Sequence, residues 1–306
     1  MKKILKMCIG LCILISIAGY CQQEKSPSAF EVVEKVSARI QQISDSGSIK
    51  NVTGTINFTV KLGESDYANL KSASEKIFGK VISNPVKLEG KFVSLLPGSG
   101  EKIEKFMMSG NSEFGSFYFY RNLDNIVILF PEMGIEIQDT ISEIRKLSQR
   151  SSMQPPPQFA EGLSMLLNPI SFKTLFNQVK FWFYDATVSS VEKSGKKLIE
   201  LNKTSPEADI KIVVMPDAWS IAQITIMADL ATITMNYRSP ASKEKVEFID
   251  YMPESITIEA IDKGNNVKIE FGSLTYNKNI DEKLFSFKKM KLSEFISSMA
   301  IKLMSQ

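Results

Sequence analysis

The chain has 306 residues and contains no histidine. This absence excludes the Ser-His and Cys-His nucleophile pairs, the commonest general base and the usual zinc sites. Cysteine is also scarce, because Cys8, Cys12 and Cys21 are the three cysteines of the chain and all lie near its start. A mature chain that has lost this segment keeps at most one thiol and cannot form an internal disulfide. Stability must therefore come from packing, for which the length is ample.

The residue patterns of common enzyme classes are missing as well. Pro97-Gly98-Ser99-Gly100 is rich in glycine, but it does not join a strand to a helix, so we interpret it as a turn and not as a phosphate-binding loop. The carboxylates are scattered along strand faces and form no tight constellation. We therefore predict that the protein is not an enzyme and that it needs no cofactor and no metal.

The charge balance argues against nucleic acid as a partner. The chain has 37 basic and 34 acidic residues, and three of the basic residues are lysines of the first six positions. Without that segment the counts of basic and acidic residues are equal, so no global field attracts an anionic polymer or an anionic membrane.

The first residues resemble a bacterial export signal. A basic start, Met1 to Lys6, is followed by an apolar run from Met7 to Gly19 that is too short to span a bilayer comfortably. We predict a signal peptide over residues 1–21, a polar spacer over 22–29 and a single domain over 30–306. The protein is then exported to the periplasm.

Cys21 has two interpretations. The phrase Ala18-Gly19-Tyr20-Cys21 partly matches the motif of lipidated cysteines, which would tether the protein to a membrane. That motif requires a small residue immediately before the cysteine, and Tyr20 is large. Plain cleavage nearby is the alternative.

The rest of the chain combines a few helices with many short strands. Ser28 and Glu31 form a capping box ahead of an amphipathic helix that ends near Gly47. Alternating segments such as Val52–Leu62, Glu254–Asp262 and Asn266–Leu274 predict strands with one apolar face, and the last two predict a hairpin. We therefore expect a mainly antiparallel β fold with helices (α+β), as one large sheet or barrel-like domain.

Two aromatic runs and two apolar helices complete the pattern. The runs Phe117–Tyr120 and Phe181–Tyr184 predict strands with aromatic ladders. A short apolar helix over Phe159–Leu167 is predicted to lie against the sheet as a lid. A C-terminal amphipathic helix, from Leu292 to Leu303, either docks on the sheet edge or anchors the protein at a membrane surface.

Three motifs resemble the LolA-like family of periplasmic lipoprotein carriers. One is Asn279-Ile280-Asp281 followed by Leu284-Phe285-Ser286-Phe287. Another is the strand Gly115–Asn122 with Pro131 and the phrase Ile135–Asp139 behind it, and the third is the apolar Leu166-Leu167-Asn168-Pro169. The chain departs from the family at Asn122, where the family has proline, and at Thr140, where it has glycine.

The resemblance implies an incomplete, half-open β-barrel of about ten strands, wrapped around an apolar cavity and covered by short helices. It also implies a carrier that takes acyl chains of lipoproteins or lipids through the cell envelope towards the outer membrane. The alternative function is an envelope regulatory or structural protein that uses the same half-barrel for protein contacts. We expect a monomer that meets acyl chains and membrane complexes of the envelope.

The site that follows from this resemblance has a lining and a lid. The predicted lining residues are Ile56, Phe58, Phe117, Phe119, Phe181, Phe183, Ile256, Ile258 and Phe271. The predicted lid residues are Met165, Leu166, Leu167 and Arg121, the last as a donor to lid carbonyls. The lining residues could equally be ordinary core that the helices seal permanently, and Arg121 could equally form a solvated salt bridge.

Overall fold

The computed structural model describes residues 27–42, 51–95, 105–113, 115–122, 125–133, 135–140, 142, 169–193, 195–240, 247–261, 264–276 and 279–280. Several predictions fall outside these residues: the export signal, Cys21, the lid residues Met165, Leu166 and Leu167, and the C-terminal helix. They stay predictions.

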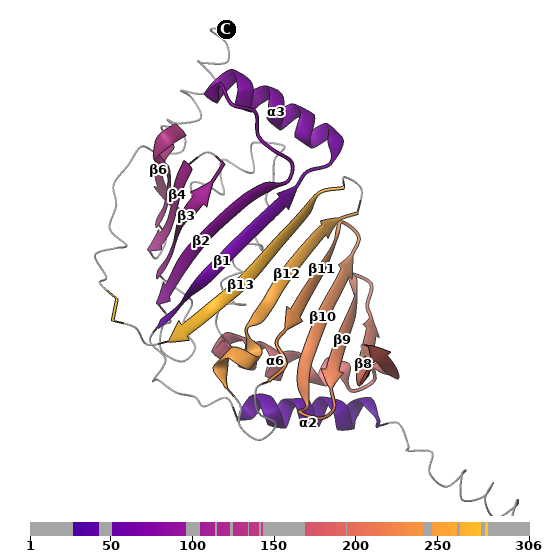
Figure 1. Cartoon of the computed structure of the whole chain (residues 1–306). Coiled ribbons are helices and arrows are strands. Elements are labelled where there is room, and N and C mark those ends of the chain that lie inside the picture. Colours follow the sequence, from indigo (N-terminus) through magenta and orange to yellow (C-terminus); the bar gives the residue numbers. More distant parts are fainter. Residues whose placement is uncertain are drawn as a thin grey trace, which may run out of the picture.

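A single antiparallel sheet dominates the described chain (Figure 1). It has thirteen strands where the sequence predicted about ten, in the order β6-β5-β4-β3-β2-β1-β13-β12-β11-β10-β9-β8-β7. The strands are β1 (Asn51–Lys61), β2 (Val86–Leu95), β3 (Lys105–Ser112), β4 (Gly115–Asn122), β5 (Asn125–Phe130), β6 (Ile135–Thr140), β7 (Thr187–Lys193), β8 (Lys196–Thr204), β9 (Ala208–Met215), β10 (Ser220–Ala228), β11 (Ala231–Tyr237), β12 (Pro253–Ala260) and β13 (Asn266–Tyr276).

The sheet consists of two meanders that join in its middle. Strands β1 to β6 and β7 to β13 each follow the chain order, and β1 pairs with β13 between them. In that central pair Ile56 lies opposite Phe271 and Phe58 lies opposite Ile269. The predicted hairpin of β12 and β13 is confirmed. Because β6 and β7 are the two ends of the sheet and do not pair, the sheet is open.

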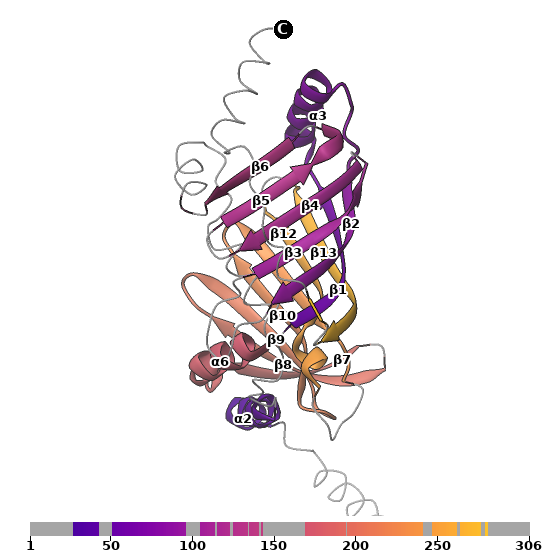
Figure 2. The ribbon, with the colours of Figure 1, turned by 90° about the vertical axis from the view of Figure 1, so that its left-hand side faces the viewer.

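The two faces of the sheet differ in chemistry because side chains alternate along each strand. The inner face carries Ile56, Phe92 and Phe271, which belong to the main hydrophobic core. The outer face carries polar neighbours on the same strands, such as Asn57 and Glu89. The sheet curves around its inner face, and helices lie on that side (Figure 2).

A pair of glycines allows tight packing between β2 and β3. Gly90 and Gly110 lie opposite each other. A Cβ atom on Gly110 would lie 2.0 Å from the carbonyl oxygen of Glu89, and one on Gly90 would lie 2.5 Å from that of Ser109. Only glycine fits at these positions without a backbone shift. The ring of Phe117 covers the pair, since its Cζ would be 3.2 Å from a Cβ on Gly90.

Helix α2 (Ala29–Gln41) begins as the sequence predicts. The Ser28 side chain accepts a hydrogen bond from the Glu31 backbone, and the Glu31 carboxylate accepts one from the Ser28 backbone, so the capping box is confirmed. The helix buries Val32, Val33 and Val36. It ends at Gln41, earlier than the predicted stop near Gly47.

Helix α6 (Pro169–Val179) continues directly into the 3-10 helix η2 (Lys180–Phe183), where the sequence predicted a strand. The four aromatic residues of Phe181–Tyr184 have high strand propensity but no alternation of apolar and polar side chains. Their packing against α2 decides the conformation instead. Two more 3-10 turns are η1 (Pro131–Met133) and η3 (Phe248–Tyr251).

Helix α3 (Glu64–Phe78) follows β1 in the chain. It lies at one end of the sheet, above β1 and β2 in Figure 1, and it ends at Gly79 in the left-handed conformation. The Asn265 side chain accepts from the Gly63 backbone at 2.8 Å and donates to Asp66 at 2.6 Å. These bonds tie the start of α3 to the turn before β13. None of the described helices is long and apolar enough to cross a bilayer.

Candidate functional site

The centre of the inner face is fully buried. Ile56 and Ile256 are each 2% exposed, and Phe117 and Phe271 are each 3% exposed. They come from four strands, β1, β12, β4 and β13, that the order of the sheet places within one apolar surface. Four of the predicted lining residues thus lie together in one core.

A second set of inner-face residues is only partly buried. Phe58 and Ile258 pack against the core from β1 and β12, and Phe119 does so from β4. Each lies two residues along its strand from a fully buried residue, and both point to the same face because side chains of a strand alternate with a period of two. These residues therefore leave apolar surface accessible beside a closed core.

Sequence reasoning missed a large part of this face. The missed residues that pack with the core on β2, β3, β5, β9, β10, β11 and β13 include Leu88, Phe92, Phe106, Phe130, Ile212, Val214, Ile221, Ile224, Ile233, Met235, Val267 and Ile269. Their signal was present as alternation within each predicted strand. The sequence carried no signal for which strands would be neighbours, because strand pairing depends on tertiary contacts.

A layer of helices closes one end of the inner face. Phe183 of η2 and Phe176 of α6 pack with Val33 and Val36 of α2 over the strands β8 and β9. The space among them is too small for a water molecule. Phe183 is 4% exposed and belongs to the hydrophobic core, although it lies in a 3-10 helix and not in a strand.

A polar clamp holds this helical layer together. Lys180 donates to the Glu34 carboxylate at 3.0 Å and to the Ser37 hydroxyl at 3.2 Å. The Tyr184 hydroxyl donates to the same carboxylate oxygen. The bond from Tyr184, and next the contact with Lys180, hold the pKa of Glu34 below its usual value. The same bond raises the pKa of Tyr184.

Phe181 is the predicted lining residue that the structure places elsewhere. Its side chain is 62% exposed, whereas that of Phe183 is 4% exposed. The prediction was wrong because it assumed a strand, in which Phe181 and Phe183 would share one face. In the 3-10 turn they point in different directions.

Arg121 shares the inner face, since it follows Phe119 by two residues on β4. It lies between Phe106 on β3 and Ile126 on β5. The residue as a whole is half-buried. Its contact with the lid residues stays a prediction.

A buried polar cluster lies where η3 meets the helices. Asp250 is 5% exposed, Arg39 is 6% exposed and Tyr251 is 2% exposed. Burial raises the pKa of Asp250, against the opposing effects of a hydrogen bond from the Glu247 backbone and the charge of Arg39. Burial also raises the pKa of Tyr251. Within the described ranges, no three Asp, Glu or Cys side chains gather as a metal site.

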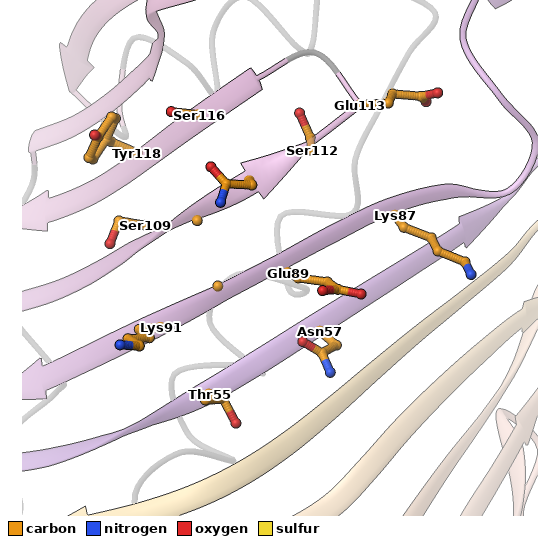
Figure 3. Close-up of a pocket in the computed structure, with 13 residues that line it drawn as sticks. Thr55, Asn57, Lys87, Glu89, Lys91, Ser109, Ser112, Glu113, Ser116 and Tyr118 are labelled. Atoms are coloured by element: carbon orange, nitrogen blue, oxygen red, sulfur yellow. The ribbon is translucent and has the colours of Figure 1, made fainter.

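The outer face has a polar groove of ≈ 810 Å³ over β1 to β4 (Figure 3). Asn57, Glu89, Asn111 and Ser116 lie side by side on these four strands. Figure 3 shows Lys87 and Lys91 on either side of Glu89 along β2, with Tyr118 at one end of the groove. The groove offers hydrogen-bond donors and acceptors and hardly any apolar side chain, so it suits a polar ligand and not an acyl chain.

Tyr118 and its neighbours form a small apolar cluster beside this groove. The rings of Tyr118 and Tyr120 stack with centroids 6.4 Å apart, and Tyr120 packs with Val127 and Leu129. Tyr120 is 7% exposed, and burial raises its pKa.

No protein-family model matches the chain, and no curated protein matches it in sequence. Its fold is similar to solved structures. One is an outer membrane lipoprotein-sorting protein domain from Vibrio parahaemolyticus, with 10% identity, a TM-score of 0.40 and coverage of 83% of this chain and 97% of that one. Another is a DUF1329 family protein from Desulfovibrio piger, with 11% identity, a TM-score of 0.42 and coverage of 85% and 98%.

A third similar structure is a LolA superfamily protein from Nitrosomonas europaea, with 9% identity, a TM-score of 0.35 and coverage of 86% of this chain and 99% of that one. The identities and TM-scores are too low to carry over a cargo or a partner.

Proposed function

We propose that the protein is a periplasmic carrier that binds the acyl chains of lipoproteins or lipids on the inner face of its open sheet. The observation that carries this proposal is the chemistry of that face. Apolar side chains from nearly every strand meet there, and Phe58, Phe119 and Ile258 are left partly exposed. An apolar surface of this extent beside a closed core is unusual for a protein that binds nothing.

The energetics of acyl binding fit this face. Each buried methylene contributes about 0.8 kcal/mol, so a long chain gains enough from an apolar surface to leave water, while an open site still allows release. The sheet is open because β6 and β7 do not pair. A ligand can therefore reach the inner face without the breaking of a strand pair.

The polar groove is not part of this proposal. Its lining of hydroxyl, amide and charged groups would leave an acyl chain in contact with polar atoms. Those atoms would then lose water without gaining hydrogen bonds. The acyl-binding surface is therefore assigned to the inner face, where Phe58, Phe119 and Ile258 are partly exposed.

The experiment uses two adjacent residues of β12 that face opposite sides. Ile258 packs on the inner face, and Thr257 lies on the outer face beside Lys268. We expect Ile258→Ser to weaken binding of a fluorescent fatty acid about tenfold, and we expect Thr257→Ser to leave it unchanged. Mass spectrometry of the protein purified from envelope extract should find an acylated ligand.

The outcome that rejects the proposal is equally specific. Absence of any acylated ligand, together with no binding of the fluorescent fatty acid, would contradict a carrier. Protein partners in the same purification, without lipid, would support the regulatory or structural alternative.

A further inference from the structure

Four large apolar side chains, three of them aromatic, are exposed on the helical layer formed by α2, α6 and η2. We call Phe30, Val179, Phe181 and Trp182 the aromatic patch. Their exposed fractions are 53%, 36%, 62% and 38%. Large apolar side chains exposed together in this way mark an interaction surface.

Ring contacts hold the patch in shape. Tyr184 packs edge-on against Phe30, with centroids 4.9 Å apart, and against Phe181, with centroids 5.4 Å apart. The clamp from Tyr184 to Glu34 fixes this shared ring. Phe30 at the start of α2 and Phe181 in η2, far apart in sequence, therefore form one preorganised surface.

Two ion pairs lie beside the patch, and their lysines also lie over the rings of Phe181 and Trp182. Lys180 pairs with Glu34 at 3.0 Å, and Lys203 pairs with Asp185 at 2.6 Å. The patch thus has apolar rings at its centre and paired charges at its rim. Such a surface binds through burial of apolar area, and electrostatic attraction contributes little.

We propose that the aromatic patch docks the protein on a lipid bilayer surface. Phe, Trp and Tyr are the side chains that favour the boundary between lipid headgroups and acyl chains. Phe30 of the patch also lies near the start of the described chain, because α2 begins at Ala29. Cys21 is eight residues earlier, so the linking chain spans at most about 29 Å.

Docking at this position would assist the proposed carrier function, and the inference about docking rests on that function. A lipid on Cys21 would hold the patch within reach of the bilayer, and stable membrane attachment usually needs two such signals. Phe183, on the other side of the same 3-10 turn, packs at the end of the inner face. Docking would therefore bring that end of the acyl-binding face to the membrane.

The test uses the mature chain with Cys21→Ser, so that no attached lipid contributes, and vesicles of phosphatidylethanolamine and phosphatidylglycerol. We expect the protein to float with the vesicles, and we expect Phe181→Ala to weaken this binding about tenfold. Leu230→Ala is the matched control, because Leu230 is 79% exposed at the β10–β11 turn, away from α2. It should leave binding unchanged. Raising the salt concentration should have little effect.

Tryptophan fluorescence adds a direct readout. The chain has two tryptophans, so Trp219→Phe leaves Trp182 as the single reporter. Its emission should shift to the blue on vesicles and be quenched by lipids brominated near the headgroup.

Three outcomes would overturn the proposal. They are no vesicle binding, binding that Phe181→Ala does not weaken, and a dimer in sedimentation that Phe181→Ala dissociates, which would make the patch an interface between copies. Loss of vesicle binding with intact fatty-acid binding would reject the docking surface alone and leave the carrier proposal standing.

Discussion

Substitutions at Ile56 and Phe58 can distinguish the contribution of the inner face to folding from its contribution to binding. They are neighbours on the same face of β1, but Ile56 is 2% exposed while Phe58 is only partly buried. Ile56→Ala should lower the free energy of unfolding by about 2 to 5 kcal/mol, because it removes buried methyl groups and leaves a cavity. Affinity for a fatty acid should change little among the molecules that remain folded.

Phe58→Ala should weaken fatty-acid binding and cost less stability than Ile56→Ala. Because part of the ring already contacts solvent, its loss should cost about 1 to 2 kcal/mol of stability, less than the roughly 3 to 5 kcal/mol of a fully buried phenylalanine. If an acyl chain covers the exposed part of the ring, the lost contact is worth about 1.5 kcal/mol, which is a tenfold weaker affinity.

Both quantities are measurable on the same preparations. Urea unfolding gives the stability of each variant, and titration with a fluorescent fatty acid gives its affinity. Asn57→Ala, on the outer face between the two positions, is the control and should change neither strongly. A Phe58→Ala variant that loses as much stability as Ile56→Ala and binds the fatty acid unchanged would show that the inner face is a sealed core.

Two further predictions concern the helical layer. Phe183→Ala should lower the free energy of unfolding by about 3 to 5 kcal/mol, whereas Phe181→Ala should hardly change it, because the two side chains are 4% and 62% exposed. If urea unfolding showed that the two variants lose equal free energy of unfolding, the 3-10 turn would be contradicted. Because Tyr184 and Lys180 lower the pKa of Glu34, its stabilising effect should be complete above about pH 4.5 and disappear as the pH falls through the lowered value. Glu34→Gln should therefore reduce the loss of stability on acidification, and an unchanged pH profile would refute the clamp.

The strands and the first helix were readable from the sequence because their signals are local. The capping box at Ser28 and the alternation in Val52–Leu62 each lie within a dozen residues. The turn between β12 and β13 likewise combines glycine and asparagine, which tolerate the required backbone angles. Such patterns survive folding when no tertiary contact opposes them.

The aromatic run Phe181–Tyr184 shows where local signals fail. Aromatic residues favour strands, yet here they form a 3-10 turn because Tyr184 and Lys180 bond to Glu34, 146 or more residues earlier in the chain. No window of neighbouring residues contains that information. The aromatic patch was missed for the same reason, since it joins Phe30 to Phe181.

The sequence by itself determined that the protein is a largely antiparallel β structure with an apolar face, because side-chain alternation has a fixed period of two in any strand. Tertiary structure alone decided which apolar residues meet. It placed β13 beside β1 in the middle of the sheet, buried Ile56 and left Phe58 half open, and turned Phe181 outward. These outcomes depend on pairings between distant segments, and only the folded chain brings those segments together.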